Sequence, residues 1–139
     1  MYSFKKSLIV PVLVLIYSCS CNDDRPYTIK DLDENMLDLK IYQENMGDEL
    51  QAGRLKDAVW LLDGMDSILH EVSRKFDEHR KLKEPFSYYY KDRMKKPIQL
   101  IRTGITDEDT AIAMKGYRLL VRKCNSCHID LDIDKMVKY

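Results

Sequence analysis

Glycine and proline are scarce in this chain, which has five Gly and four Pro among 139 residues. A β-sandwich needs many turns built from these residues, so their scarcity favours a helical protein. No internal repeat is visible, which excludes a solenoid, and the length suits one small domain. Basic and acidic residues number 23 each, giving a formal net charge of zero. Nothing in this balance indicates binding to nucleic acid.

Histidine and cysteine are also sparse, with three His and four Cys. Two of the cysteines and one histidine gather in a single motif near the C-terminus, Cys124-Asn125-Ser126-Cys127-His128. A C-x-x-C-H motif predicts covalent attachment of one haem, because two thiols add to the two vinyl groups of a porphyrin and the adjacent imidazole binds the iron. Cys124 and Cys127 are therefore candidate attachment residues, and His128 is a candidate axial ligand.

Two other chemistries compete for this motif. A zinc site needs about four ligands, and the chain offers no second C-x-x-C or H-x-x-x-H. A redox dithiol gains its low pKa at the N-terminus of a helix, whereas this motif follows a long predicted helix. The dithiol stays open as an alternative to haem.

The N-terminus predicts export. Residues 1–18 contain a basic pair, Lys5 and Lys6, followed by an almost purely aliphatic run over 8–16 that is too short to span a bilayer with ease. This pattern is typical of a signal peptide. Because c-type haem is attached outside the cytoplasm, an export signal and the C-x-x-C-H motif support each other.

A lipid anchor is expected directly after the signal. Ile16-Tyr17-Ser18-Cys19 resembles a bacterial lipobox, which predicts cleavage before Cys19 and lipidation of its thiol. An ordinary signal peptide or an uncleaved anchor is the alternative. Residues 19–28 are polar and predict a tether, and 29–139 form the folded domain. The protein is then lipid-anchored in the bacterial cell envelope, on the periplasmic face of the outer membrane or at the cell surface.

Apolar residues recur at spacings of three and four over four segments, and each segment predicts an amphipathic helix. The segments are approximately 29–51, 54–82, 87–103 and 106–124. Gly53, Pro85 and Gly104 are expected to end the first three, and Pro97 should kink the third. Thr106 is the predicted N-cap of the fourth.

Short connections between such helices predict an all-α fold, an antiparallel up-down-up-down four-helix bundle. One end of the bundle then holds the start of the first and third helices and the end of the second and fourth. The haem should lie at that end, near the C-terminal end of the last helix. Four aromatic residues also gather there and predict either a wall for the porphyrin or ordinary packing: Phe86, Tyr88, Tyr89 and Tyr90.

A second iron ligand should lie at about the same distance along the bundle as the motif. At a rise of 1.5 Å per residue, His128 lies about 30 Å and Met36 about 24 Å from the opposite end, which makes Met36 the candidate. His79 reaches a similar height on the second helix and is the rival. A methionine on an apolar helix face such as that of Met36 often simply fills the core. A histidine in the last turns of a helix, such as His79, can simply cap backbone carbonyls. For both residues, ligation and the structural role stay open.

Four helices with C-x-x-C-H in the last and a methionine in the first resemble the class II c-type cytochromes, the cytochrome c-prime group with its six-coordinate low-spin members. The resemblance covers residues 29–131. It implies one covalent haem c held by Cys124 and Cys127, with His128 as axial ligand and Met36 as the sixth ligand of the low-spin type.

The leading hypothesis is therefore electron transfer by a membrane-tethered monohaem cytochrome, which is not an enzyme. The first alternative is a haem protein of the cytochrome c-prime type that binds NO or CO. The second is a haem-free bundle with a redox dithiol. Partners would be the membrane, through the N-terminal lipid, and an unidentified redox protein, with no nucleic acid; a homodimer stays open.

Overall fold

The computed structural model describes residues 26–76, 82–134 and 136–138. This part of the chain consists of helices and loops and contains no strand. The helices are α1 (Ile29–Gln51), α2 (Leu55–Lys75), α3 (Phe86–Tyr89), the π-helical segment η1 (Tyr90–Met94), α4 (Lys95–Thr106) and α5 (Thr110–Asp130). Because α3, η1 and α4 follow one another directly, there are four long helical segments. The predicted all-α class is confirmed, and the segments are consistent with a four-helix bundle.

The predicted signal peptide, Cys19 and His79 lie outside the described residues. The last residues of the predicted tether are described and contact the helices. Thr28 caps α1, and its backbone N–H donates to Asp31 Oδ2 at 2.7 Å. Tyr27 packs its ring edgewise on Phe76. The start of α1 is thus held by a capping box and an aromatic contact.

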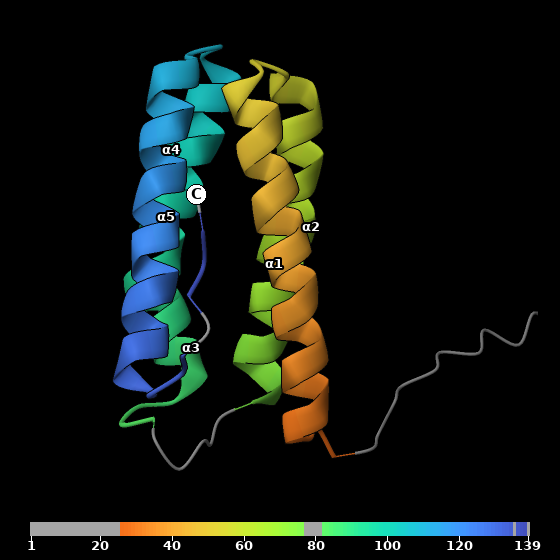
Figure 1. Cartoon of the computed structure of the whole chain (residues 1–139), viewed down its shortest axis with the longest axis vertical. Helices are drawn as coiled ribbons and strands as arrows, with labels where there is room; N and C mark the ends of the chain where they lie inside the picture. Colours follow the sequence, from red (N-terminus) through yellow and green to blue (C-terminus); the bar gives the residue numbers. More distant parts are fainter. Residues whose placement is uncertain (1–25, 77–81, 135, 139) are drawn as a thin grey trace, which may run out of the picture.

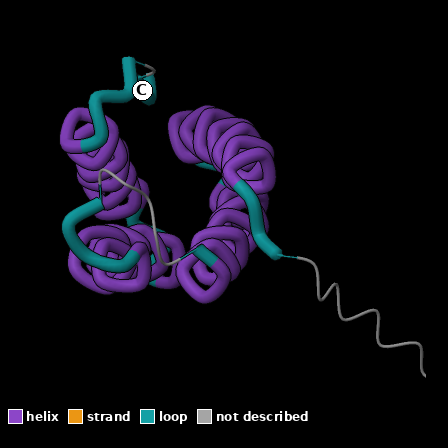
Figure 2. The backbone as a smooth tube through the Cα atoms, turned by 90° about the horizontal axis from the view of Figure 1, so that it is seen from below, coloured by secondary structure: helices purple, strands orange, loops and turns teal. Residues whose placement is uncertain are grey.

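The helices form two pairs, α1 with α2 and α4 with α5 (Figure 1). The turns within both pairs lie at one end of the molecule, which we call the turn pole. The beginning of α1 and the end of α5 lie at the other end, the motif pole. Seen along the helices, the C-terminal residues lie at the outer edge of the gap between α5 and α1 (Figure 2).

Small residues bring α4 and α5 into backbone contact. A Cβ atom on Gly104 would lie 2.2 Å from the backbone nitrogen of Ala113, and one on Gly116 would lie 2.7 Å from that of Ile101. Gly104 therefore allows the two helices to approach closely and does not end a helix. The predicted end of the third helix at this glycine is wrong, because α4 continues to Thr106.

The predicted N-cap of the last helix is wrong as well. Thr106 is the last residue of α4, and α5 is capped by Asp109, whose side chain accepts a hydrogen bond from the backbone N–H of Ile112 at 3.0 Å. Both residue types cap helices, and the tight turn between the two packed helices selects the later one.

The second helix was predicted to reach residue 82, and this is also wrong. It ends at Lys75, and Phe76 adopts φ −124° and ψ 88°. Its ring is nevertheless buried, so the apolar spacing correctly indicated burial but not helical backbone.

An irregularity near Pro97 was predicted as a kink, and the structure shows π-helical hydrogen bonding just before it. The backbone N–H of Lys95 donates to the carbonyl of Tyr90, five residues earlier. Pro97 has no N–H, and its ring collides with the preceding turn of a regular α-helix. A wider π turn at this place relieves the conflict.

Helix α5 ends in a Schellman turn that reverses the chain. Asp132 adopts a left-handed conformation, with φ 54°, and the backbone N–H of Ile133 donates to the carbonyl of His128 at 2.9 Å. The following residues run back between α5 and α1 (Figures 1 and 2).

Replacing Gly104 by alanine tests the backbone contact between α4 and α5. Overpacking should lower the free energy of unfolding by about 1–3 kcal/mol, although alanine is the better helix former. Urea denaturation followed by circular dichroism measures the change. Gly53→Asn is the control, because a Cβ there meets no atom within 4 Å and asparagine tolerates its φ of +72°. Equal stability of Gly104→Ala and the wild-type protein would contradict the contact.

Candidate functional site

The side of α5 that faces α1 is set by Tyr117. Its phenol oxygen accepts a hydrogen bond from Gln43 Nε2 on α1. Gly47 makes room for the ring, since a Cβ there would lie 2.3 Å from the phenol oxygen. Cys124 and His128 follow Tyr117 by seven and eleven residues, spacings that return to the same helix face. Both therefore lie on the side of α5 turned toward α1.

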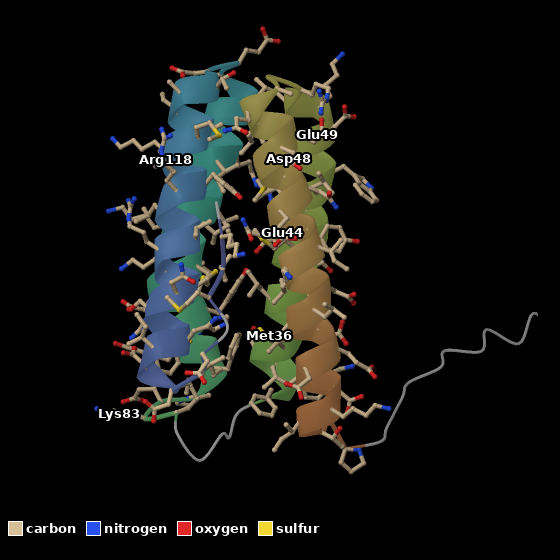
Figure 3. All side chains as sticks on the ribbon, viewed as in Figure 1. Met36, Glu44, Asp48, Glu49, Lys83 and Arg118 are labelled. Atoms are coloured by element: carbon tan, nitrogen blue, oxygen red, sulfur yellow. The ribbon has the colours of Figure 1, made fainter. Side chains whose placement is uncertain are left out.

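Met36 occupies the matching side of α1. It precedes Gln43 by seven residues, and Figure 3 shows it on the inner side of the helix. Because α1 begins and α5 ends at the motif pole, Met36 and Cys124 both lie about 10 Å from the Gln43–Tyr117 contact toward that pole. His128 lies about 6 Å further along α5. Met36 thus faces Cys124 and His128 across one seam, the α1–α5 seam.

Packing in this seam differs between the two poles. Toward the turn pole the inward residues of α1 are fully buried: Gln43, Met46 and Leu50. Toward the motif pole they are half-buried, although they still pack on the hydrophobic core: Leu32, Met36 and Leu39. The seam therefore presents partly accessible apolar surface beside the motif, which is the kind of lining that a flat apolar group needs.

Cys124 and Cys127 are free thiols one helical turn apart. Cys124 packs on the core, and Cys127 is 7% exposed. Burial raises the pKa of the Cys124 thiol to about 12, with a contribution from neighbouring Cys127. Burial also raises the pKa of Cys127, although the charge of Arg93 opposes this. At neutral pH both are protonated, whereas a reactive dithiol needs a lowered pKa.

Arg93 on η1 lies beside the motif and was missed by the sequence analysis. Its Nη1 lies 2.7 Å from Asp130 Oδ2 and donates to Ser126 Oγ at 3.4 Å. Its guanidinium carbon sits 4.9 Å from the ring centroid of Tyr89. A planar guanidinium is suited to pairing with carboxylates. Arg93 is distant from the motif in sequence, so only tertiary packing reveals the neighbourhood.

Two of the four aromatic residues at the motif pole serve the core. Phe86 and Tyr90 are buried within it, and the Tyr90 phenol donates to Asp66 Oδ1 of α2 at 2.8 Å. Burial, together with this carboxylate, raises the pKa of Tyr90 to about 12. Tyr88 is 52% exposed. The Tyr89 ring packs against the Arg93 guanidinium, which in turn contacts Ser126 within the motif.

The described side chains contain no group of three or more His, Cys, Asp or Glu arranged to hold a metal ion by themselves. None of the helices in the described ranges combines the length and apolar character needed to cross a membrane. Comparisons of the chain with protein-family models, with curated proteins and with solved structures found no match.

The side chains of the motif nevertheless match the donor set of a covalently attached haem. Two protonated thiols one turn apart and an adjacent imidazole are the donor set that such attachment requires. The half-buried apolar side of α1 lies across from them, with a thioether at Met36. Arg93 adds a cation near the motif.

The raised pKa of Cys124 predicts a pH-dependent stability of the haem-free protein. Below the ordinary thiol pKa of 9.0 both folded and unfolded states are protonated; above it the unfolded chain ionises first, until the folded pKa of about 12 is reached. The free energy of unfolding should therefore fall by about 2 kcal/mol between about pH 8 and about pH 10.5 through this group alone. Urea denaturation at both pH values should show a smaller fall in the free energy of unfolding for Cys124→Ala than for the wild-type protein. Parallel losses in the two proteins would contradict the shifted pKa.

Proposed function

We propose that this protein is a membrane-tethered monohaem c-type cytochrome that transfers electrons. One haem c would lie near the C-terminal end of the last helix of an antiparallel up-down-up-down four-helix bundle. The observation that carries the proposal is the α1–α5 seam, in which Cys124 and His128 face Met36 across half-buried apolar surface.

Each side chain has a chemical role in this proposal. The thiols of Cys124 and Cys127 would add across the two vinyl groups, with sulfur bonding to the carbon next to the ring and the thiol proton passing to the terminal carbon. Burial keeps both thiols protonated and hence able to supply that proton. His128 and Met36 would supply the imidazole and thioether ligands of the iron. When bound, the haem supplies an iron that takes up and releases one electron.

The surroundings of the haem would affect its reduction potential. The apolar side chains of α1 exclude water from one side, and a Met/His ligand pair raises the reduction potential. Arg93 adds a positive charge on the other side of α5, where it pairs with Asp130. Lipidation at Cys19, supported by the lipobox, would hold the domain at the bacterial cell envelope.

Covalent haem attachment is tested by expressing the exported chain with a c-type haem ligation system. We expect a pyridine haemochrome spectrum of a haem with two thioether bonds, because both vinyl groups would be saturated. Cys124→Ala should give the spectrum of a single thioether bond, and the double variant Cys124→Ala/Cys127→Ala should carry no covalent haem. Cys21→Ala, outside the motif, is the control and should retain the wild-type spectrum. A haem-free wild-type protein would refute the proposal and favour the dithiol.

Met36→Leu tests the second iron ligand. The swap nearly conserves volume and should cost less than about 1.5 kcal/mol of stability, while the variant loses the low-spin spectrum and gains rapid CO binding in the ferrous state. Met114→Leu, at a half-buried methionine of α5, is the matched control and should remain low-spin. A wild-type protein that already binds CO rapidly would instead favour the gas-binding haem protein, and an unchanged spectrum in Met36→Leu would exclude Met36.

A further inference from the structure

The residues after α5 form a strap over the α1–α5 seam. We use this name for residues 131–134 and 136–138, which run back between α5 and α1 at the motif pole (Figures 1 and 2). The turn at Asp132, with its positive φ, directs the strap along α5.

Asn125, at one of the two unspecified positions of the motif, holds this strap. Its Nδ2 donates to the carbonyl of Val137 at 3.0 Å, and the backbone N–H of Val137 donates to its Oδ1 at 2.7 Å. The amide N–H and the amide oxygen of one side chain are thus matched to the backbone carbonyl and the backbone N–H of one residue. On the other side of the seam, Gln43 Nε2 donates to the carbonyl of Lys138 at 3.0 Å.

Val137 is the strap residue that enters the seam. It is half-buried and packs on the same core as Cys124, the residue directly before Asn125. Ile133 and Met136, by contrast, are 38% and 48% exposed. The strap therefore covers the seam beside Cys124 with one apolar side chain and a few hydrogen bonds. Such a segment opens locally, at far lower cost than unfolding of the bundle.

We propose that Asn125 is a positioning residue, which latches the strap over the seam and so controls access to the Cys124 thiol. The identity of the group that must enter, a haem, rests on the proposed function. The shielding of the Cys124 thiol does not, because it follows from Asn125, Val137 and their hydrogen bonds.

Thiol alkylation of the full chain, made without haem ligation, tests the latch. Pulses of iodoacetamide are followed by mass spectrometry that localises the label to each cysteine. We expect Asn125→Ala to accelerate labelling of Cys124 about tenfold, since two hydrogen bonds to the strap are lost. Asn125→Asp, which keeps the acceptor and loses the donor, should fall between. Asn45→Ala, at an exposed position of α1, is the matched control and should label as the wild-type protein does.

Amide hydrogen exchange separates strap release from general unfolding. The backbone N–H of Val137 should lose its protection in Asn125→Ala, while the amides of α1 and α5 near the Gln43–Tyr117 contact keep theirs. Equal labelling of Cys124 in the wild-type and Asn125→Ala proteins would overturn the latch, and so would faster labelling accompanied by lost protection throughout the bundle.

A parallel expression with haem ligation distinguishes the two proposals. Faster labelling in Asn125→Ala with covalent haem in the wild-type protein supports both. Faster labelling without any haem attachment leaves the latch standing and refutes the cytochrome. Haem attachment with unchanged labelling refutes the latch alone.

Discussion

The hydrogen bond between Gln43 and Tyr117 sets the register between the first and last helices, and the candidate site depends on that register. Gly47 allows the tyrosine ring to approach α1 closely enough for the bond. Once these helices are aligned at this point, Met36 and Cys124 are level because each is seven residues away in the direction of the motif pole. A shift of one helical turn would move Met36 by about 5 Å and separate it from the motif.

Helices α4 and α5 pack more closely against each other than α1 and α5 do. Backbones meet at Gly104 and Gly116, which locks α4 against α5, whereas the α1–α5 seam relies on longer side chains and on the strap. A protein interior cannot be close-packed everywhere and still accept a large flat group. The division between a tight pair of helices and a looser seam is therefore what the proposed haem would require.

Much of this fold could be predicted from the sequence because apolar spacing is a local signal. The stripe of α1 is correct from Leu32 to Leu50, and the start at Ile29 follows from the capping residue before it. Gly104 misled the prediction because its neighbour Ala113 belongs to another helix, and a glycine that permits contact looks like one that ends a helix. Arg93 and Asn125 carried no signal, since their partners become neighbours only after folding.

The Schellman turn at the end of α5 has a further mechanical consequence. The carbonyl of His128 accepts from the N–H of Ile133, the point at which the strap departs from the helix. The same carbonyl also accepts from the N–H of Leu131, so the start of the strap is tied to the backbone of His128 by two hydrogen bonds. The far end of the strap is tied to α1 through Gln43 and Lys138, so the strap links the backbone of this histidine to the first helix.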